Sequence, residues 1–183
     1  MDGIADAGLA AAYLPLRKPV HLGIDHDAGA AVVVQPGIAV TNAHNANLVE
    51  PATVLGRSRQ YDLLFFRTGR TTAQDTAQPL AGEAVIAYGQ SAFDPRTRLA
   101  HGVVRIVDSM PLCTLCGPHR VFGFEGDAGE GFSGGPVLDA ANGRLLGIVF
   151  SYDDPRPGHQ PMIYAYDMTL VQAELAAVLK PRN

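Results

Sequence analysis

A glycine-rich turn around one serine is the strongest chemical signal in the sequence. Residues 131–136 read GFSGGP, with Ser133 at the centre. The glycines allow a sharp turn whose backbone N–H groups point at one spot beside the serine hydroxyl, as an oxyanion hole requires. The alternative is a structural glycine-rich turn with an incidental serine. The turn alone leaves both interpretations open.

A histidine and an aspartate stand where a base and its orienting carboxylate would be expected. His44 follows an apolar run that ends in TNA, so it would leave a rigid strand in a fixed orientation. Asp62 begins the apolar run YDLLFF, where its carboxylate would be costly to bury without a partner such as an imidazole N–H. Separately these are an ordinary surface histidine and a strand-edge aspartate. Together with Ser133 they predict a catalytic triad.

The elements that must position these residues are short strands. The chain has 183 residues, 20 glycines, 13 prolines and 17% charged residues, a composition that favours strands and tight turns over long helices. A hairpin is expected where Gln35-Pro36-Gly37 joins two apolar runs, and a second after Ser133, around Asn142-Gly143. Strands are expected at residues 30–34, 38–41, 52–55, 63–67, 84–88, 102–107 and 121–124.

Helices are expected only near the two ends. Residues 4–14 are rich in Ala and Leu and predict a short helix that Pro15 ends. Residues 169–180 have helical periodicity, with Thr169 as a candidate N-cap and Pro181 beyond the end. The polar stretch 68–79 would join two halves, which suits an all-β fold of two barrels with the site between them.

The segments TNAHN, YDLLFF, GFSGGPVLD and GRLLGIVF resemble the signature blocks of the trypsin-like (chymotrypsin-fold) serine peptidase superfamily. The sequence is most similar to bacterial HtrA-type members, over about residues 28–170. The resemblance implies a single domain, 1–183, with two six-stranded antiparallel β-barrels at about 15–75 and 80–168, an active site between them, and a C-terminal α-helix at 169–180.

The resemblance also implies an activity, that of a serine endopeptidase without a cofactor. Ser133 would attack the peptide carbonyl and form an acyl-enzyme, His44 would take and return the proton, and Asp62 would orient the imidazole. The N–H groups of Gly131 and Ser133 would hold the oxyanion. A protein or peptide would be the substrate.

Two features of the sequence depart from the family pattern, one residue and one spacing. Phe132 stands where digestive-type members carry an aspartate that pairs with a newly cut N-terminus, so activity without cleavage is expected. The spacing of 18 residues from His44 to Asp62 is short and suggests that one hairpin of the first barrel is trimmed.

Primary specificity is the subject of a separate hypothesis about Asp127, six residues before Ser133. Trypsin has the aspartate at the base of its primary pocket at this offset, so Asp127 would favour substrates with Arg or Lys. Against this, HtrA-type members differ in loop length before the serine and prefer small apolar residues, and Glu130 could instead point into or rim the pocket. The alternative for Asp127 is a solvated loop acid.

Two other function classes compete with the peptidase. The GFSGG segment also fits the G-x-S-x-G elbow of α/β-hydrolase esterases, but Pro136 and a hairpin follow where that fold needs a helix, and only His159 remains as a base. A catalytically inactive binding module on the peptidase fold is the other alternative.

The segment Cys113-x2-Cys116-x2-His119 offers three zinc ligands where a closed structural site needs four. We therefore expect free thiols or a local bridge, and no metal.

Composition bounds the partners and the compartment. The net charge of -4 gives no electrostatic reason to expect nucleic acid or an anionic membrane as partner. Two cysteines make no framework of bridges, and the N-terminal charge order is the reverse of a secretory signal, so a cytoplasmic location is expected. The natural substrate and the oligomeric state stay open.

Overall fold

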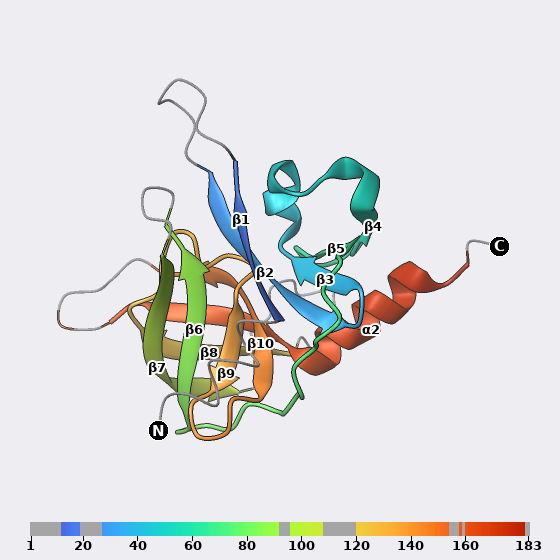
Figure 1. Ribbon diagram of the computed structural model, residues 1–183. Helices are drawn as coiled ribbons and strands as arrows, with labels where there is room; N and C mark the ends of the chain where they lie inside the picture. The colour runs from blue at the N-terminus through green and yellow to red at the C-terminus, as the bar shows by residue number, and fades with distance from the viewer. Residues whose placement is uncertain are drawn as a thin grey trace.

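The computed structural model describes residues 12–18, 27–91, 96–107, 120–153, 158 and 160–181. Over these residues the chain forms an open five-stranded sheet, a closed six-stranded barrel and a C-terminal helix. Figure 1 shows β3, β4 and β5 on one side, the barrel strands on the other, and β1 and β2 between them.

The first sheet has the strand order β1-β2-β3-β5-β4. Its neighbouring strands are antiparallel, and the predicted hairpin is confirmed as β2 and β3, with Gly37 at φ +80° in the turn. Two short 3-10 helices, η1 and η2, lie between β3 and β4. The strands and 3-10 helices are β1 Tyr13–Arg17, β2 Ala28–Gln35, β3 Ile38–Thr41, η1 Ala43–Leu48, η2 Pro51–Thr53, β4 Val54–Arg57 and β5 Leu64–Arg67.

The sheet is open in the described residues, so the closed six-stranded first barrel that was expected is not confirmed. Only η1, η2 and the edge strand β4 separate β3 from β5, in agreement with the short spacing between His44 and Asp62.

The second half is the expected six-stranded barrel, in the order β10-β11-β8-β7-β6-β9. Pairing of β9 with β10 on one side and β6 on the other closes it, so no strand edge is left unpaired. Phe122, Phe124 and Leu146 belong to the buried cluster of the barrel. Its strands are β6 Ala84–Gln90, β7 Thr97–Val107, β8 Val121–Gly126, β9 Pro136–Asp139, β10 Leu145–Tyr152 and β11 Met162–Asp167.

The helix predicted at residues 4–14 extends too far at its C-terminal end. Ala12 is helical, but Tyr13 and Leu14 already lie in strand β1, which pairs with β2, and residues before Ala12 lie outside the described part. Pro15 is tolerated in β1 because the strand is at the edge of the sheet, where a missing N–H costs no ladder bond.

The C-terminal helix α2, Met168–Leu179, is confirmed, but its N-cap is Asp167 rather than Thr169. The Asp167 carboxylate accepts the Leu170 N–H at 2.8 Å, and an acid there also suits the positive end of the helix dipole. No helix in the described part of the chain is long and apolar enough to cross a membrane.

One buried cluster joins the two halves. It includes Phe65 from β5, Leu145 and Ile148 from β10, and Leu175 from α2, all at most 1% exposed. Because close-packed interiors leave little freedom for relative movement, this shared core fixes the loops of the sheet against those of the barrel. Side chains from both halves can therefore form one site.

Candidate active site

Strand pairing brings His44 and Asp62 together. Thr41, at the end of β3, pairs with Leu64, at the start of β5, so the residues just outside the two strands lie side by side. His44 Nδ1 lies 2.5 Å from Asp62 Oδ2, and the His44 backbone N–H donates to Asp62 Oδ1 at 3.0 Å. The carboxylate thus engages both the ring and the backbone of His44, which fixes the orientation of the imidazole.

The two side chains shift each other's pKa. The hydrogen bond from Asp62 raises the pKa of His44 above its usual 6.5, and partial burial opposes this without cancelling it. Burial acts to raise the pKa of Asp62, but the hydrogen bonds from His44, together with its charge, outweigh burial and hold that pKa below 3.8. Near neutral pH Asp62 is a carboxylate that stabilises a proton on the imidazole.

Two residues that were not singled out in the sequence fix the backbone of Asp62. The Asn42 side-chain amide donates to the Asp62 carbonyl at 2.9 Å. The Asp62 N–H donates to the Tyr166 hydroxyl at 3.3 Å. Burial raises the pKa of Tyr166 to about 12, so this hydroxyl keeps its proton. Asn42 could have been noticed because it stands in the TNAHN segment. No residue next to Tyr166 in the sequence indicates its contact with Asp62.

The backbone of Ser133 is fixed to the first sheet. Its carbonyl accepts the Ala30 N–H of β2 at 3.0 Å and the side-chain amide of Asn45 at 3.0 Å. Asn45 directly follows His44 and also donates to Thr41 Oγ1. The residues around His44 therefore hold the Ser133 turn, although the hydrogen bonds of the described residues include none from the Ser133 hydroxyl.

Glycine is required where this turn meets the sheet. Gly134 has φ +82°, and a Cβ there would collide with the Ala30 carbonyl and with Thr41 Oγ1. The sheet and the turn are therefore in backbone contact, closer than any other residue would permit.

The backbone N–H groups of residues 131–135 divide into two sets. Those of Phe132, Gly134 and Gly135 donate to the carbonyls of Gly129, Val149 and Phe132, at 2.8 to 3.1 Å. In the described structure the N–H groups of Gly131 and Ser133 have no protein acceptor. Folded chains pair nearly all such groups or leave them to solvent or a ligand. These two were the expected oxyanion donors.

Gly131 has the conformation that this turn demands. The Phe132 N–H bonds the Gly129 carbonyl, so residues 129–132 form a β-turn with Gly131 in its third position at φ +86°. Type II turns require a positive φ there, hence glycine.

The remaining predicted residues differ in how far the structure describes them. Phe132 is 1% exposed and packs in the barrel cluster. Asp127 is exposed, so its role at the base of a pocket stays a prediction. Cys113, Cys116 and His119 lie outside the described residues, as does His159. In the part of the chain that is described, no group of three or more His, Cys, Asp or Glu side chains could hold a metal ion.

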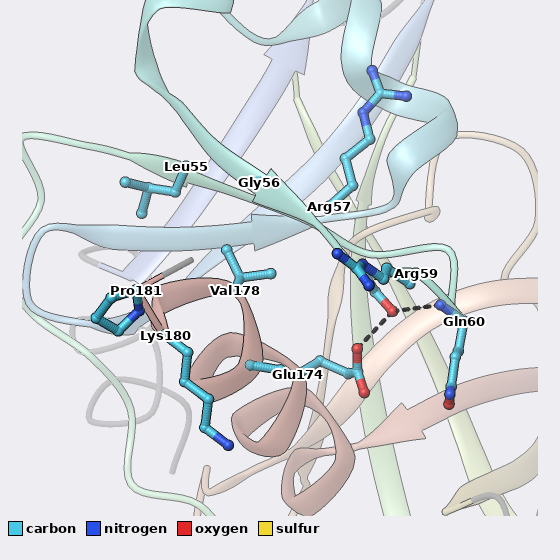
Figure 2. A pocket seen from close by; sticks show the side chains of 11 residues that line it. Leu55, Gly56, Arg57, Arg59, Gln60, Glu174, Val178, Lys180 and Pro181 are labelled. Atoms are coloured by element: carbon cyan, nitrogen blue, oxygen red, sulfur yellow. Dashed lines mark hydrogen bonds between the residues drawn. The ribbon is translucent and has the colours of Figure 1, made fainter. Parts of the chain in front are cut away.

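A cavity of about 520 Å³ lies elsewhere, between β4 and α2, and none of the predicted site residues lines it. Figure 2 shows Arg57 and Lys180 at its rim pointing in opposite directions, so these two cations do not converge on one ligand. The cavity includes Ser58, Arg59 and Gln60, which lead to Asp62 along the chain. The cavity is therefore lined by part of the loop that leads to Asp62, and it is separate from the candidate site.

Comparisons with known proteins agree with this geometry. A sequence model of the family described as Trypsin-like peptidase domain matches residues 27–148. No curated protein matches the chain significantly.

Solved structures resemble the chain over its whole length. The HtrA-type protease AlgW with a tripeptide matches with a TM-score of 0.77 and 18% identity, covering 96% of this chain and 62% of that one. The Rv3671c protease from M. tuberculosis in its active form matches with a TM-score of 0.73 and 17% identity, covering 99% and 86%. The inactive form of Rv3671c gives a TM-score of 0.75 at 18% identity, with 98% and 94% covered. At such identities the likeness establishes a shared fold.

Proposed function

The chain belongs to the trypsin-like peptidase domain family, and we propose that it is a serine endopeptidase in which His44, Asp62 and Ser133 form the catalytic triad. Peptide bonds of a protein or peptide are the substrate. AlgW, of the same fold, is an HtrA-type protease solved with a tripeptide. Extending that substrate class to this chain is part of the proposal.

The proposed reaction follows from the roles of the three side chains. His44 takes the Ser133 proton as the hydroxyl oxygen attacks the peptide carbonyl, and it returns that proton to the leaving amine. An acyl-enzyme remains on Ser133, and water releases it by the same steps in reverse order. Asp62 keeps the imidazole in the tautomer that accepts a proton at Nε2, because its carboxylate lies against Nδ1.

The observation that carries the proposal is the pair of N–H groups without an acceptor. In a turn whose other three N–H groups are bonded, those of Gly131 and Ser133 are left available for a ligand oxygen. Two backbone donors beside a serine hydroxyl are what a tetrahedral intermediate requires.

The test is labelling by a fluorophosphonate probe, which reacts fast only with a base-activated serine. Wild-type protein should label, while Ser133→Ala and His44→Ala should not; intact mass should show a single adduct, and mass spectrometry of a tryptic digest should assign it to the peptide that contains Ser133. Ser151→Ala, a serine on β10, is the matched control and should label like the wild type. A folded wild-type protein that does not label would instead be a binding module of the same fold.

Primary specificity is the finer part of the proposal. Asp127 is exposed, and in the proposal it is the acidic group of the primary pocket that pairs with a substrate Arg or Lys. A mixed peptide library decides this. Preferential cleavage after Arg and Lys, lost in Asp127→Ser, supports the assignment; cleavage after small apolar residues in both proteins removes it.

A further inference from the structure

The candidate oxyanion hole depends on the orientation of two peptide groups. The peptide that joins Glu130 to Gly131 carries the Gly131 N–H, and the peptide that joins Phe132 to Ser133 carries the Ser133 N–H. In a trans peptide the N–H points opposite to the carbonyl of the same plane. Whatever holds the carbonyls of Glu130 and Phe132 therefore decides where the two N–H groups point.

The two carbonyls are held in different ways. The Phe132 carbonyl accepts the Gly135 N–H at 2.8 Å, so the turn itself sets the direction of the Ser133 N–H. The Glu130 carbonyl accepts Nη1 of Arg98 at 3.1 Å. Arg98 lies on β7, far away in the sequence. The direction of the Gly131 N–H thus depends on a side chain from outside the turn.

Arg98 contacts the turn a second time. Its guanidinium carbon lies 5.2 Å from the centre of the Phe132 ring, within the range of a cation–π contact. Phe132 cannot shift away, because the ring is buried against Gly89, where an added Cβ would meet it at 2.6 Å. A planar guanidinium can cover a ring face and still direct an N–H at a carbonyl. Arg98 therefore contacts the turn on both sides of Gly131, at the Glu130 carbonyl and at the Phe132 ring.

The next peptide of the turn is fixed from β6. The Gly131 carbonyl accepts the Gln90 N–H at 2.9 Å. The Gln90 side chain is 1% exposed; its amide nitrogen donates to the Tyr13 hydroxyl at 2.8 Å, and its amide oxygen accepts Nη2 of Arg17 at 2.6 Å. Gln90 is anchored to β1 in this way. Among the described contacts of residues 130–133, the Glu130–Gly131 peptide is therefore the one whose carbonyl is held by an exposed side chain.

We propose that Arg98 is a positioning residue for the oxyanion hole, which holds the Glu130 carbonyl outward and so keeps the Gly131 N–H directed at the substrate oxygen. The inference rests on the proposed function, because it assigns a purpose to that N–H. Without Arg98 the peptide is free to rotate, and rotation would replace a donor in the hole by a carbonyl oxygen. Arg98 itself touches neither the substrate carbonyl nor the triad in this role.

The experiment compares Arg98→Ala with Arg105→Ala. Arg105 lies on the same strand and forms an exposed ion pair with Glu125, so its loss is the matched control. On p-nitrophenyl acetate, a small ester that must form an oxyanion, Arg98→Ala should lower kcat about tenfold with KM changed less than twofold. The upper limit is the 10²- to 10³-fold loss typical of removing one donor. Arg98→Lys keeps a donor and should recover part of the loss.

A second readout follows the peptide itself. The amide chemical shift of Gly131, measured by NMR, should move in Arg98→Ala and stay in place in Arg105→Ala. Equal kcat values for the two variants, or a loss that appears only in KM with an unmoved Gly131 amide, would overturn the proposal. If Arg98→Ala does not fold, Arg98→Lys and Arg98→Gln carry the same comparison. Wild-type protein inert to ester and probe would instead reject the proposed function, and the Gly131 shift would still decide the positioning role.

Discussion

The sheet and the barrel supply different parts of the candidate site and hold them in different ways. His44 and Asp62 lie at strand ends of the open sheet, with side chains 50% and 33% exposed. The Ser133 turn belongs to the closed barrel. Its glycines are in close contact with neighbouring backbone and Phe132 is buried, so the conformation of the turn is fixed. Proton transfer needs a group that solvent and substrate can reach, whereas oxyanion stabilisation needs fixed dipoles. The asymmetry matches these two demands.

The largest loss of kcat is expected from a substitution in the part of the site that the sheet supplies. Asp62→Asn keeps the shape of the side chain but replaces the carboxylate that faces His44 Nδ1 at 2.5 Å with an amide. The wrong imidazole tautomer should then lower kcat by about four orders of magnitude, with the melting temperature little changed. Asp75→Asn is the control, since Asp75 is exposed in the linking stretch. A large loss in Asp75→Asn, with none in Asp62→Asn, would contradict the assignment.

The pH profile sharpens the same prediction. The imidazole must be neutral to accept the Ser133 proton, and its pKa is raised, so kcat/KM should rise with pH along a limb centred above 6.5. Residual activity of Asp62→Asn should have this limb at lower pH.

The contributions of His44 and Asp62 to the free energy of unfolding depend on pH in opposite directions. The raised pKa of His44 contributes stability that is complete below 6.5 and is lost as pH rises through the folded-state value. The lowered pKa of Asp62 contributes stability present above 3.8 and lost as pH falls. The pair should therefore stabilise the fold most between these two values.

The second largest loss is expected from a substitution in the part of the site that the barrel supplies. Gly131→Ala places a side chain at φ +86°, where its Cβ would collide with the Gln90 carbonyl, so the turn must change conformation. Losing one oxyanion donor typically lowers kcat 10²- to 10³-fold, and we expect a loss of that size in probe-labelling rate.

Gly129→Ala is the matched control for Gly131→Ala. Gly129 has no positive φ, and an added Cβ would meet nothing within 4 Å. Wild-type labelling in this control, with loss in Gly131→Ala, isolates the hole from the composition of the turn. Equal losses in the two variants would mean that the whole turn, and not one N–H, had been disturbed.

Local patterns in the sequence predicted the features that depend on residues close together in the chain. Gly37 at a hairpin turn, the PVLD hairpin after Ser133 and the apolar strand before His44 depend on residues close together in the chain. The residues of the proposed triad were singled out for a similar reason, because each stands in a short motif of its own.

What the sequence could not predict depends on distant partners. The Ala- and Leu-rich pattern extends the predicted helix to Leu14, yet pairing of Tyr13 with Val32 and the hydrogen bond from the Tyr13 hydroxyl to the Gly89 carbonyl place Tyr13 in a strand. Tyr166 and Arg98 support the site from other strands, and no neighbour in the sequence marks either of them. Thr169 was the predicted cap, but the helix begins directly after β11, which ends at Asp167, and Asp167 is therefore the cap.

The smallest expected effect tests whether the sheet's half of the site tolerates loss of its outer support. Ser58 accepts the N–H groups of Gln60 and Tyr61 at 3.1 and 2.9 Å, and its hydroxyl donates to Glu174 of α2 at 2.7 Å, as the dashed lines of Figure 2 show in part. This loop leads directly to Asp62. Ser58→Ala should cost about 1 kcal/mol of unfolding free energy, a typical net value for lost hydrogen bonds that water can partly replace.

The same variant should lower kcat only about threefold, a change of about 0.7 kcal/mol in the barrier, since Asn42 and Tyr166 still hold the backbone of Asp62. Urea unfolding and turnover of labelled casein measure the two quantities. Thr53→Ala, which removes an exposed hydrogen bond to the Glu50 carbonyl, is the control and should leave kcat unchanged. If Ser58→Ala lowered kcat as much as Gly131→Ala, the sheet would be as intolerant as the barrel, and the asymmetry between the two regions would be wrong.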